Sequence, residues 1–222
     1  MAINKEKYNE IINELGGHAT LVAVSKTKPV EDIQALYVLG QRDFGENYVQ
    51  ELTEKQSQLP KDICWHFIGH LQSNKVKQIA PFVYLIHGVD SLKLLQEINK
   101  QAAKLDKVIN VLLQVYIANE ETKFGLDESE LDGIISNDHL EALKNICVCG
   151  LMGMASFTEE EVVIKKEFDY LKSLYDKYAQ LQIPNSRFQF LSMGMSGDYR
   201  IALQEGSNMV RIGSLLFGAR TN

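Results

Sequence analysis

The chain has 222 residues and a formal net charge of −6, from 23 Lys and Arg residues against 29 Asp and Glu residues. Its 45% of hydrophobic residues and 23% of charged residues are typical of a soluble globular protein. The acidic balance argues against nonspecific binding to nucleic acid or to an anionic membrane, because both require a basic surface. It remains compatible with a local basic pocket for one small anion.

Neither a targeting segment nor an oxidising environment is indicated. Residues 1–15 are polar with a helical pattern and lack the apolar centre of a secretory leader. No stretch approaches the roughly 20 apolar residues that span a bilayer. Cys64, Cys147 and Cys149 lie in apolar runs and have neither zinc-ligand nor C-x-x-C redox spacing. We therefore expect a cytoplasmic protein with reduced cysteines.

Short, β-rich apolar runs alternate with helical patterns along the whole chain. Strands are expected near residues 20–25, 43–45, 64–68, 83–87, 108–117, 146–152, 188–191 and 209–212. Helices are expected near residues 5–15, 29–40, 49–59, 76–79, 95–105, 128–143, 164–178 and 201–203.

About eight strands that alternate with helices predict an α/β fold, a (β/α)₈ TIM barrel. A doubly wound open sheet is the alternative architecture. Because too few residues follow the last expected strand for a full final helix, we expect the helix at residues 5–15 to complete the outer ring. With no linker or break in composition, one domain is expected over residues 1–222.

Lys26 is the first candidate for a functional residue. It directly follows an apolar strand, so a barrel would carry it to the carboxyl-terminal mouth where barrel enzymes place their sites. An amine held among apolar walls has a lowered pKa and attacks an aldehyde to form a Schiff base. A solvated lysine at a strand end is the simpler alternative.

The loops after the last two expected strands have the composition of a phosphate cradle. Barrel proteins often bind phosphate there through backbone N–H groups. Gly194, Ser196 and Gly197 suit one half of such a cradle, and Gly213 and Ser214 suit the other. Ordinary turn glycines and a serine helix cap are the alternative.

Arg211 and His66 are polar residues inside β-rich runs. A buried arginine needs an acceptor, so Arg211 is either half of a core salt bridge or a contact for an anion or a heterocycle nitrogen. By its own pattern, His66 is interpreted as a core histidine with its hydrogen bonds satisfied. No metal-ligand spacing is present, and no metal site is predicted.

Five segments together resemble the pyridoxal phosphate homeostasis protein family. They are LVAVSKTKP at residues 21–29, FGENY at 44–48, HFIGHLQSNK at 66–75, FLSMGMS at 190–196 and MVRIG at 209–213. The resemblance runs from the first expected strand to the carboxyl-terminal region. It implies a barrel like the amino-terminal domain of alanine racemase and the binding of pyridoxal 5′-phosphate (PLP).

The same resemblance implies roles for individual residues. Lys26 would form the Schiff base with PLP, and Arg211 would face the pyridine nitrogen. The remaining residues that it places around the phosphate and along the cofactor are Ser192, Ser196, Gly213, Ser214, Asn47 and His66.

The chemistry of these residues argues against catalysis. PLP acts as an electron sink when a carboxylate keeps its ring nitrogen protonated, whereas an arginine keeps its own proton and leaves that nitrogen unprotonated. Racemisation also needs an acid or base on each face of the substrate carbon, and we expect this length to leave no second domain to supply the second group. The resemblance accordingly implies a protein without catalytic residues that holds PLP and supplies or buffers it in vitamin B6 homeostasis.

Two other functions stay open from the residues. One is a PLP-dependent enzyme acting on amino acids, such as a weak racemase, and the other is a phosphate-binding barrel enzyme unrelated to PLP. The expected partners are PLP and apo forms of PLP-dependent enzymes as recipients, with no nucleic acid and no membrane. The expected state is a monomer.

Overall fold

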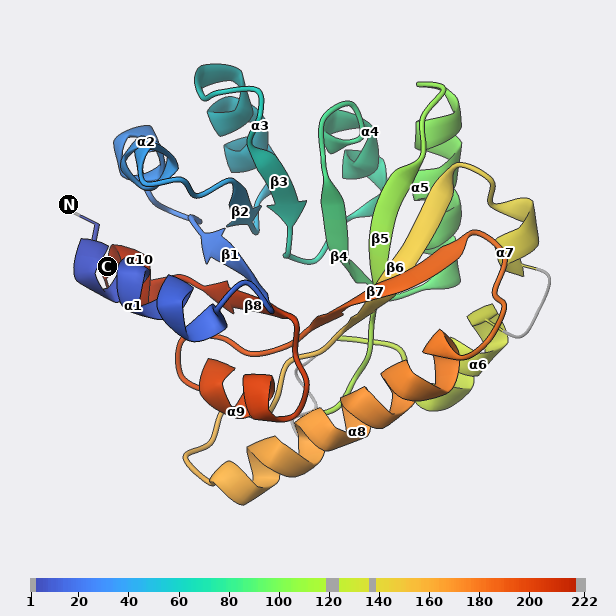
Figure 1. Cartoon of the computed structure of the whole chain (residues 1–222). Coiled ribbons are helices and arrows are strands. Elements are labelled where there is room, and N and C mark those ends of the chain that lie inside the picture. Colours follow the sequence, from blue (N-terminus) through green and yellow to red (C-terminus); the bar gives the residue numbers. More distant parts are fainter. Residues whose placement is uncertain (1–2, 119–123, 136–138, 219–222) are drawn as a thin grey trace.

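The computed structural model describes residues 3–118, 124–135 and 139–218, and their strands form a closed parallel barrel (Figure 1). The strands pair in chain order, and the last closes on the first. Their bounds are β1 (Thr20–Val24), β2 (Asp43–Glu46), β3 (Cys64–Phe67), β4 (Leu85–Val89), β5 (Ile109–Gln114), β6 (Ile146–Met152), β7 (Ser186–Ser192) and β8 (Met209–Ile212). The predicted barrel is confirmed, and the open-sheet alternative is excluded.

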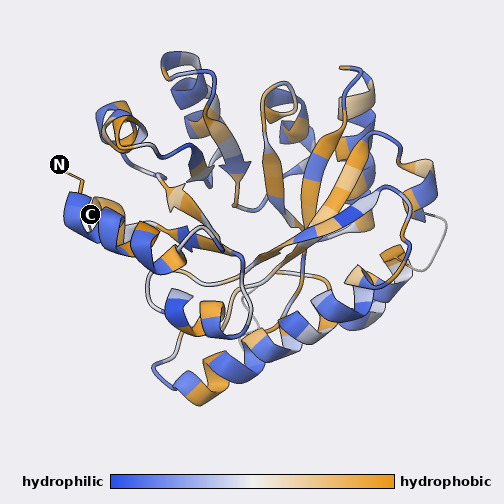
Figure 2. Ribbon diagram, viewed as in Figure 1, coloured by the Kyte–Doolittle hydropathy of each residue, from blue (hydrophilic) through white to orange (hydrophobic). Residues whose placement is uncertain are grey.

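The helices lie around the outside of the barrel (Figure 1). Hydrophobic residues are frequent in the strands and alternate with hydrophilic residues along the helices, as expected of amphipathic helices on a sheet (Figure 2). The bounds are α1 (Lys5–Leu15), α2 (Val30–Val38), α3 (Val49–Gln58), η1 (Ser73–Lys75), α4 (Val76–Ile79), α5 (Leu92–Ala103), α6 (Glu128–Ile135), α7 (His139–Ala142), α8 (Glu161–Ala179), α9 (Tyr199–Gln204) and α10 (Ser214–Phe217).

Helix α1 completes the outer ring, as the sequence predicts. It lies beside the short α10, which follows β8 (Figure 1). The Asn4 N–H donates to the Leu216 carbonyl at 2.8 Å. The Asn4 side chain caps α1 by accepting from the Lys7 N–H at 3.0 Å. The backbone hydrogen bond from Asn4 to Leu216 joins the beginning of the described chain to its end.

Some element boundaries differ from the prediction. Strand β4 begins at Leu85 and runs to Val89, beyond the expected end, because Gly88 lets it pass close to the chain beside it. A Cβ on Gly88 would lie 2.6 Å from the Gly69 carbonyl oxygen. Strand β5 ends at Gln114, short of the expected residue 117. The expected helix at 128–143 is described as α6 and α7, and residues 136–138 between them lie outside the described residues.

Strand alternation divides the core into two layers and positions the polar side chains. Val210 and Ile212 pack with the helices in the large outer core, whereas Met209 packs inside the barrel. Arg211 is paired in register with Val22, which also lies in the inner cluster. A single arginine is thereby carried inside the barrel on a strand that is otherwise apolar. Within the described residues, no helix is long and apolar enough to cross a membrane.

Candidate functional site

A pocket of about 460 Å³ lies at the carboxyl-terminal ends of the strands. This volume is in the range of pockets that bind small molecules. The predicted site residues that line it are Lys26, Asn47, Ser196, Arg211, Gly213 and Ser214. The structure therefore brings together six residues that are spread along the sequence from the end of the first strand to the end of the last.

Lys26 stands in a tight turn between β1 and α2. The Ser25 N–H donates to the Gly45 carbonyl of β2 at 3.0 Å, and the Lys28 N–H donates back to the Ser25 carbonyl at 3.0 Å. The Lys28 ammonium donates to the Phe217 carbonyl at 2.9 Å, so its charge is bound at the end of α10. Lys26 is half-buried and lines the pocket. The two neighbouring lysines therefore have different surroundings.

A buried charge network lies beneath this turn. Glu46 is fully buried at the end of β2, and its Oε1 accepts from the Lys55 ammonium at 2.8 Å. Lys55 also donates to the Ser25 carbonyl at 2.7 Å and to Glu51 Oε1 at 2.5 Å. Burial raises the pKa of Glu46 to about 7, although Lys55 opposes the shift. The network ties the turn that carries Lys26 to β2 and α3.

Sequence reasoning missed this network because α3 looks like a polar surface helix. Glu51 and Lys55 have the i,i+4 spacing of an exposed helical ion pair, which is the one signal that the sequence offers. Nothing in that spacing indicates that Lys55 is buried against the end of β2.

Arg211 lines the pocket with its guanidinium buried. Its Nη1 donates to the Ser192 carbonyl at 2.8 Å and to the Ser192 Oγ at 2.7 Å, and its Nη2 donates to the Gly153 carbonyl at 3.0 Å. Burial lowers the pKa of Arg211 to about 10, and the charge of Asp198 opposes this shift. Arg211 therefore stays charged at neutral pH. A guanidinium has five N–H groups, so the three bonds to the protein leave donors for a ligand.

The predicted phosphate end combines two loops. The Gly213 N–H donates to the Ser196 Oγ at 3.3 Å, which joins the loop after β7 to the start of α10. A Cβ on Gly197 would meet no heavy atom within 4 Å, so this glycine borders open space. Gly194 has a different role: its φ is +95°, and a Cβ there would lie 2.5 Å from the Ala202 Cβ of α9. Gly194 is thus needed for close packing of the loop against α9.

His66 and Ser192 lie inside the barrel, outside the set of described residues that line the pocket. Ser192 contacts Arg211 directly, and His66 is joined to Ser192 through His87. His87 carries no role in the sequence interpretation. The sequence signal for its burial is that the residues two before and two after it in the strand are apolar.

Asn47 contributes a buried acceptor that no described residue uses. Its Oδ1 has no hydrogen-bond partner among the described residues, and the side chain lines the pocket. An unpaired buried amide oxygen is costly, so a ligand that donates a hydrogen bond there would be favoured.

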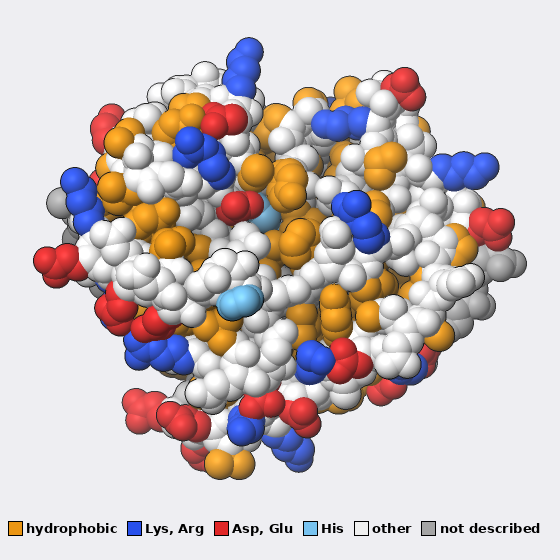
Figure 3. All heavy atoms as spheres, viewed as in Figure 1, with side chains coloured by type: hydrophobic (Ala, Val, Ile, Leu, Met, Phe, Trp, Pro, Cys, Tyr) orange, Lys and Arg blue, Asp and Glu red, His pale blue; other side chains and the backbone are white. Residues whose placement is uncertain are grey.

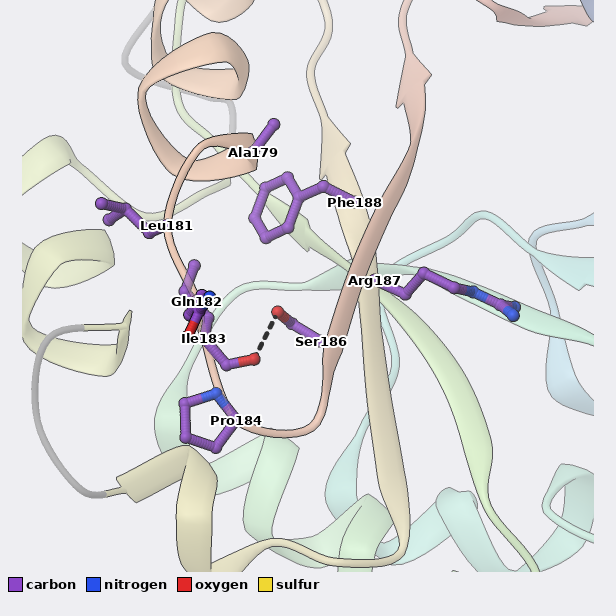
Figure 4. A pocket seen from close by; sticks show the side chains of 8 residues that line it. All are labelled: Ala179, Leu181, Gln182, Ile183, Pro184, Ser186, Arg187 and Phe188. Carbon is purple, nitrogen blue, oxygen red and sulfur yellow. Dashed lines mark hydrogen bonds between the residues drawn. The ribbon is translucent and has the colours of Figure 1, made fainter.

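A second pocket, of about 410 Å³, lies where α8 leads into β7 (Figure 4). It is lined by Ala179, Leu181, Gln182, Ile183, Pro184, Ser186, Arg187 and Phe188. The Ser186 hydroxyl in it donates to the Ile183 carbonyl at 2.8 Å, and Arg187 points away from the other side chains drawn. It is at the start of β7, whereas Ser192 is at its end. In the described part of the chain, no three His, Cys, Asp or Glu side chains form a metal-binding group.

A closed barrel with a lysine directly after its first strand defines the class to which this protein belongs. Comparison with known proteins identifies the family within that class. The family model described as "Alanine racemase, N-terminal domain" matches residues 4–221. Alanine racemase of Clostridium difficile shares the fold with a TM-score of 0.74 at 17% identity, covering 100% of this chain and 59% of the racemase.

More similar proteins narrow the assignment. The pyridoxal phosphate homeostasis protein of Pasteurella multocida is 40% identical over 205 residues, covering 90% of this chain and 86% of that protein. The solved structure of PipY from Synechococcus elongatus without PLP matches with a TM-score of 0.90 at 33% identity, covering 96% of this chain and 99% of PipY. PipY with PLP bound matches at 0.87 and 34%, with the same coverage. This chain belongs to the pyridoxal phosphate homeostasis protein family.

Proposed function

We propose that this chain binds PLP covalently through Lys26 and holds it for delivery to other proteins, without transforming an amino acid. The observation that carries the proposal is the meeting of Lys26 and Arg211 in one pocket. Membership of a family named for PLP homeostasis and the PLP-bound structure of PipY support it.

The residues of the pocket fit PLP group by group. Lys26 would hold the aldehyde carbon, and Arg211 retains N–H donors for the ring nitrogen. The unpaired Asn47 Oδ1 offers an acceptor beside the ring. Ser196, Gly213 and Ser214 line the pocket where two loops meet, and they would hold the phosphate.

The predicted roles of His66 and Ser192 change in this proposal. Ser192 would act on the cofactor through Arg211, since its carbonyl and hydroxyl oxygens both accept from the guanidinium. His66 stands one residue further back, behind His87. Neither would touch PLP.

Several properties of the pocket support storage over catalysis. Bound PLP supplies a reactive aldehyde, and its ring withdraws electrons strongly only when the ring nitrogen is protonated. Arg211 keeps its own proton, so it would stabilise the unprotonated ring nitrogen. Among the described lining residues, the amines are Lys26 and Lys28, and Lys28 is bound to the Phe217 carbonyl. The racemase alternative requires a second acid or base opposite Lys26.

We extend the proposal to the setting of the protein. The recipients would be apo forms of PLP-dependent enzymes, and the protein would act in the cytoplasm as a monomer consisting of one domain over residues 1–222. The closed barrel supports the single domain. The three free cysteines support a reducing compartment.

A transfer experiment separates delivery from catalysis. The PLP-loaded protein is desalted and mixed with an apo-aminotransferase, and recovery of aminotransferase activity is followed beside an assay for racemisation of amino acids. We expect recovered activity and no racemisation. Saturating turnover of an amino acid that disappears in Lys26→Ala would instead establish the racemase alternative.

A further inference from the structure

A chain of hydrogen bonds runs inside the barrel from the pocket arginine to a distant aspartate. Arg211 Nη1 lies 2.7 Å from Ser192 Oγ, and Ser192 Oγ lies 3.1 Å from His87 Nδ1. His87 Nε2 lies 2.9 Å from His66 Nδ1, and His66 Nε2 lies 2.9 Å from Asp43 Oδ1. Four successive contacts thus connect a buried cation to a carboxylate.

The chain leads from one end of the barrel to the other. Arg211 and Ser192 stand near the pocket, whereas Asp43 is the first residue of β2, at the amino-terminal end of the sheet. His66, His87 and Ser192 are fully buried, and the side chain of Asp43 is 27% exposed. The face of the molecule in Figure 3 has a hollow in its middle, with acidic and histidine side chains visible inside it. The aspartate end of this chain of hydrogen bonds is therefore accessible to solvent, and its arginine end lies at the pocket.

The two ends fix the direction of every hydrogen bond between them. A guanidinium only donates and a carboxylate only accepts, and a neutral imidazole carries one proton. His66 must donate from Nε2 to Asp43, so its Nδ1 accepts from His87 Nε2–H. His87 Nδ1 then accepts from the Ser192 hydroxyl, which leaves the Ser192 oxygen to accept from Arg211. All four hydrogen bonds point from Arg211 toward Asp43.

The surroundings of His87 favour its neutral form. Burial lowers the pKa of His87 well below its usual range, and a positive charge on His66 or Arg211 adds to this effect. A protonated His66 would donate from both ring nitrogens and would reverse the bond to His87. Neutral rings keep the four bonds aligned, and aligned bonds in a low-dielectric interior strengthen one another.

We propose that Asp43, His66 and His87 are positioning residues for Arg211. Acting through the Ser192 hydroxyl, they hold the guanidinium in place and give its buried charge an anionic counterpart at the far end of the barrel. Asp198 supports the same charge through space. The identity of the Arg211 ligand rests on the proposed function, but the placement of Arg211 itself does not.

The first test uses the ligand-free protein and needs no variant. Two-dimensional ¹H–¹⁵N NMR of the histidine rings reports which nitrogen carries the proton. We expect both His66 and His87 as Nε2–H tautomers at neutral pH. A His87 protonated on Nδ1 would overturn the proposal, because the bond to Ser192 would then point the opposite way.

Variants of Asp43 test whether the far end acts on Arg211. In Asp43→Leu the acceptor is lost, so we expect Nδ1–H forms of the two histidines and faster hydrogen exchange of the Arg211 guanidinium. Asp43→Asn keeps an acceptor oxygen without charge and should fall between Asp43→Leu and wild type. The matched control is Asp90→Leu. Asp90 pairs with the exposed His70 at 3.1 Å and takes no part in the hydrogen bonds between Arg211 and Asp43. Guanidinium exchange in Asp43→Leu equal to that in Asp90→Leu would overturn the proposal.

The PLP-loaded protein gives a second and separable reading. A less ordered Arg211 should weaken PLP binding about three- to tenfold in Asp43→Leu, the effect of about one hydrogen bond. The absorbance band of the lysine-bound cofactor should shift as well. Unchanged PLP binding and absorbance in a folded Asp43→Leu would contradict the positioning role while leaving the proposed function intact. Failure of wild type to bind PLP would contradict the proposed function, and the ligand-free measurements would still decide the role of Asp43.

Discussion

The Ser25 hydroxyl donates to Glu46 Oε1 at 2.6 Å, which fastens the residue before Lys26 to a buried carboxyl at the end of β2. The position of the Lys26 amine therefore depends on an ionisable group that itself is not among the described residues that line the pocket. The Lys55 ammonium binds the same carboxyl and also the Ser25 carbonyl, so the three groups form one buried unit.

Glu46 should make stability fall with rising pH. Its pKa is raised to about 7 in the folded protein, against an ordinary value of 4.5, so folding takes up a proton between these pH values. Stability contributed by this group is fully present below about pH 4.5 and is lost as the pH rises through 7. The free energy of unfolding of wild type minus that of Glu46→Gln should fall by roughly 2–3 kcal/mol between pH 5 and pH 8.

Urea unfolding of both proteins at each pH measures this difference. Taking the difference cancels other titrating groups, including His87, whose lowered pKa gives stability that is lost as the pH falls. A difference that stays constant or grows with pH would show that Glu46 is ionised in the folded protein throughout this range.

Arg211→Met should cost stability as well as PLP binding. The substitution leaves the Gly153 carbonyl oxygen without its buried donor, whereas the Ser192 carbonyl oxygen keeps the Gly153 N–H at 3.1 Å. An unsatisfied buried acceptor costs about 1–3 kcal/mol, so we expect a loss of that size in urea unfolding. A variant as stable as wild type would indicate that water replaces the guanidinium, and would weaken the interpretation of Arg211 as a fixed part of the barrel.

Asn47→Ala should show the opposite balance. The Oδ1 of Asn47 has no partner among the described residues and is costly to bury, so its removal should leave the unfolding free energy unchanged or raise it. PLP binding, followed by absorbance titration, should weaken several-fold because the acceptor offered to the ligand is gone. Equal PLP affinity in the two proteins would remove Asn47 from the site.

Two loop glycines separate packing from binding. Gly194→Ala combines a φ of +95° with a Cβ 2.5 Å from Ala202 Cβ, and we expect a loss of about 1–3 kcal/mol in unfolding free energy. Gly197→Ala borders open space at the pocket and should leave stability within about 0.5 kcal/mol of wild type. Thermal unfolding of both variants and of wild type measures this difference in stability. An unfolding temperature of Gly194→Ala equal to that of wild type would contradict the prediction.

The sequence sufficed for the barrel because alternating apolar runs and amphipathic helices determine it. Strands β6 and β8 have the predicted bounds, and α1 closes the ring as expected. Lys26 and Arg211 could be identified because each follows or interrupts an apolar strand. The placement of side chains across the barrel could not be predicted from the sequence. The contact of His66 with His87, for example, depends on the register of β3 and β4 and on the closure of the sheet.

Covalent loading is the most direct test of the central claim that Lys26 holds PLP. The protein is incubated with PLP, reduced with borohydride, digested and mapped by mass spectrometry, with Lys28→Ala and Lys26→Ala run in parallel. We predict one pyridoxyl-modified site at Lys26, retained in Lys28→Ala and absent in Lys26→Ala. Modification at Lys28 with Lys26 unmodified, or a wild-type protein that takes up no PLP, would contradict the account.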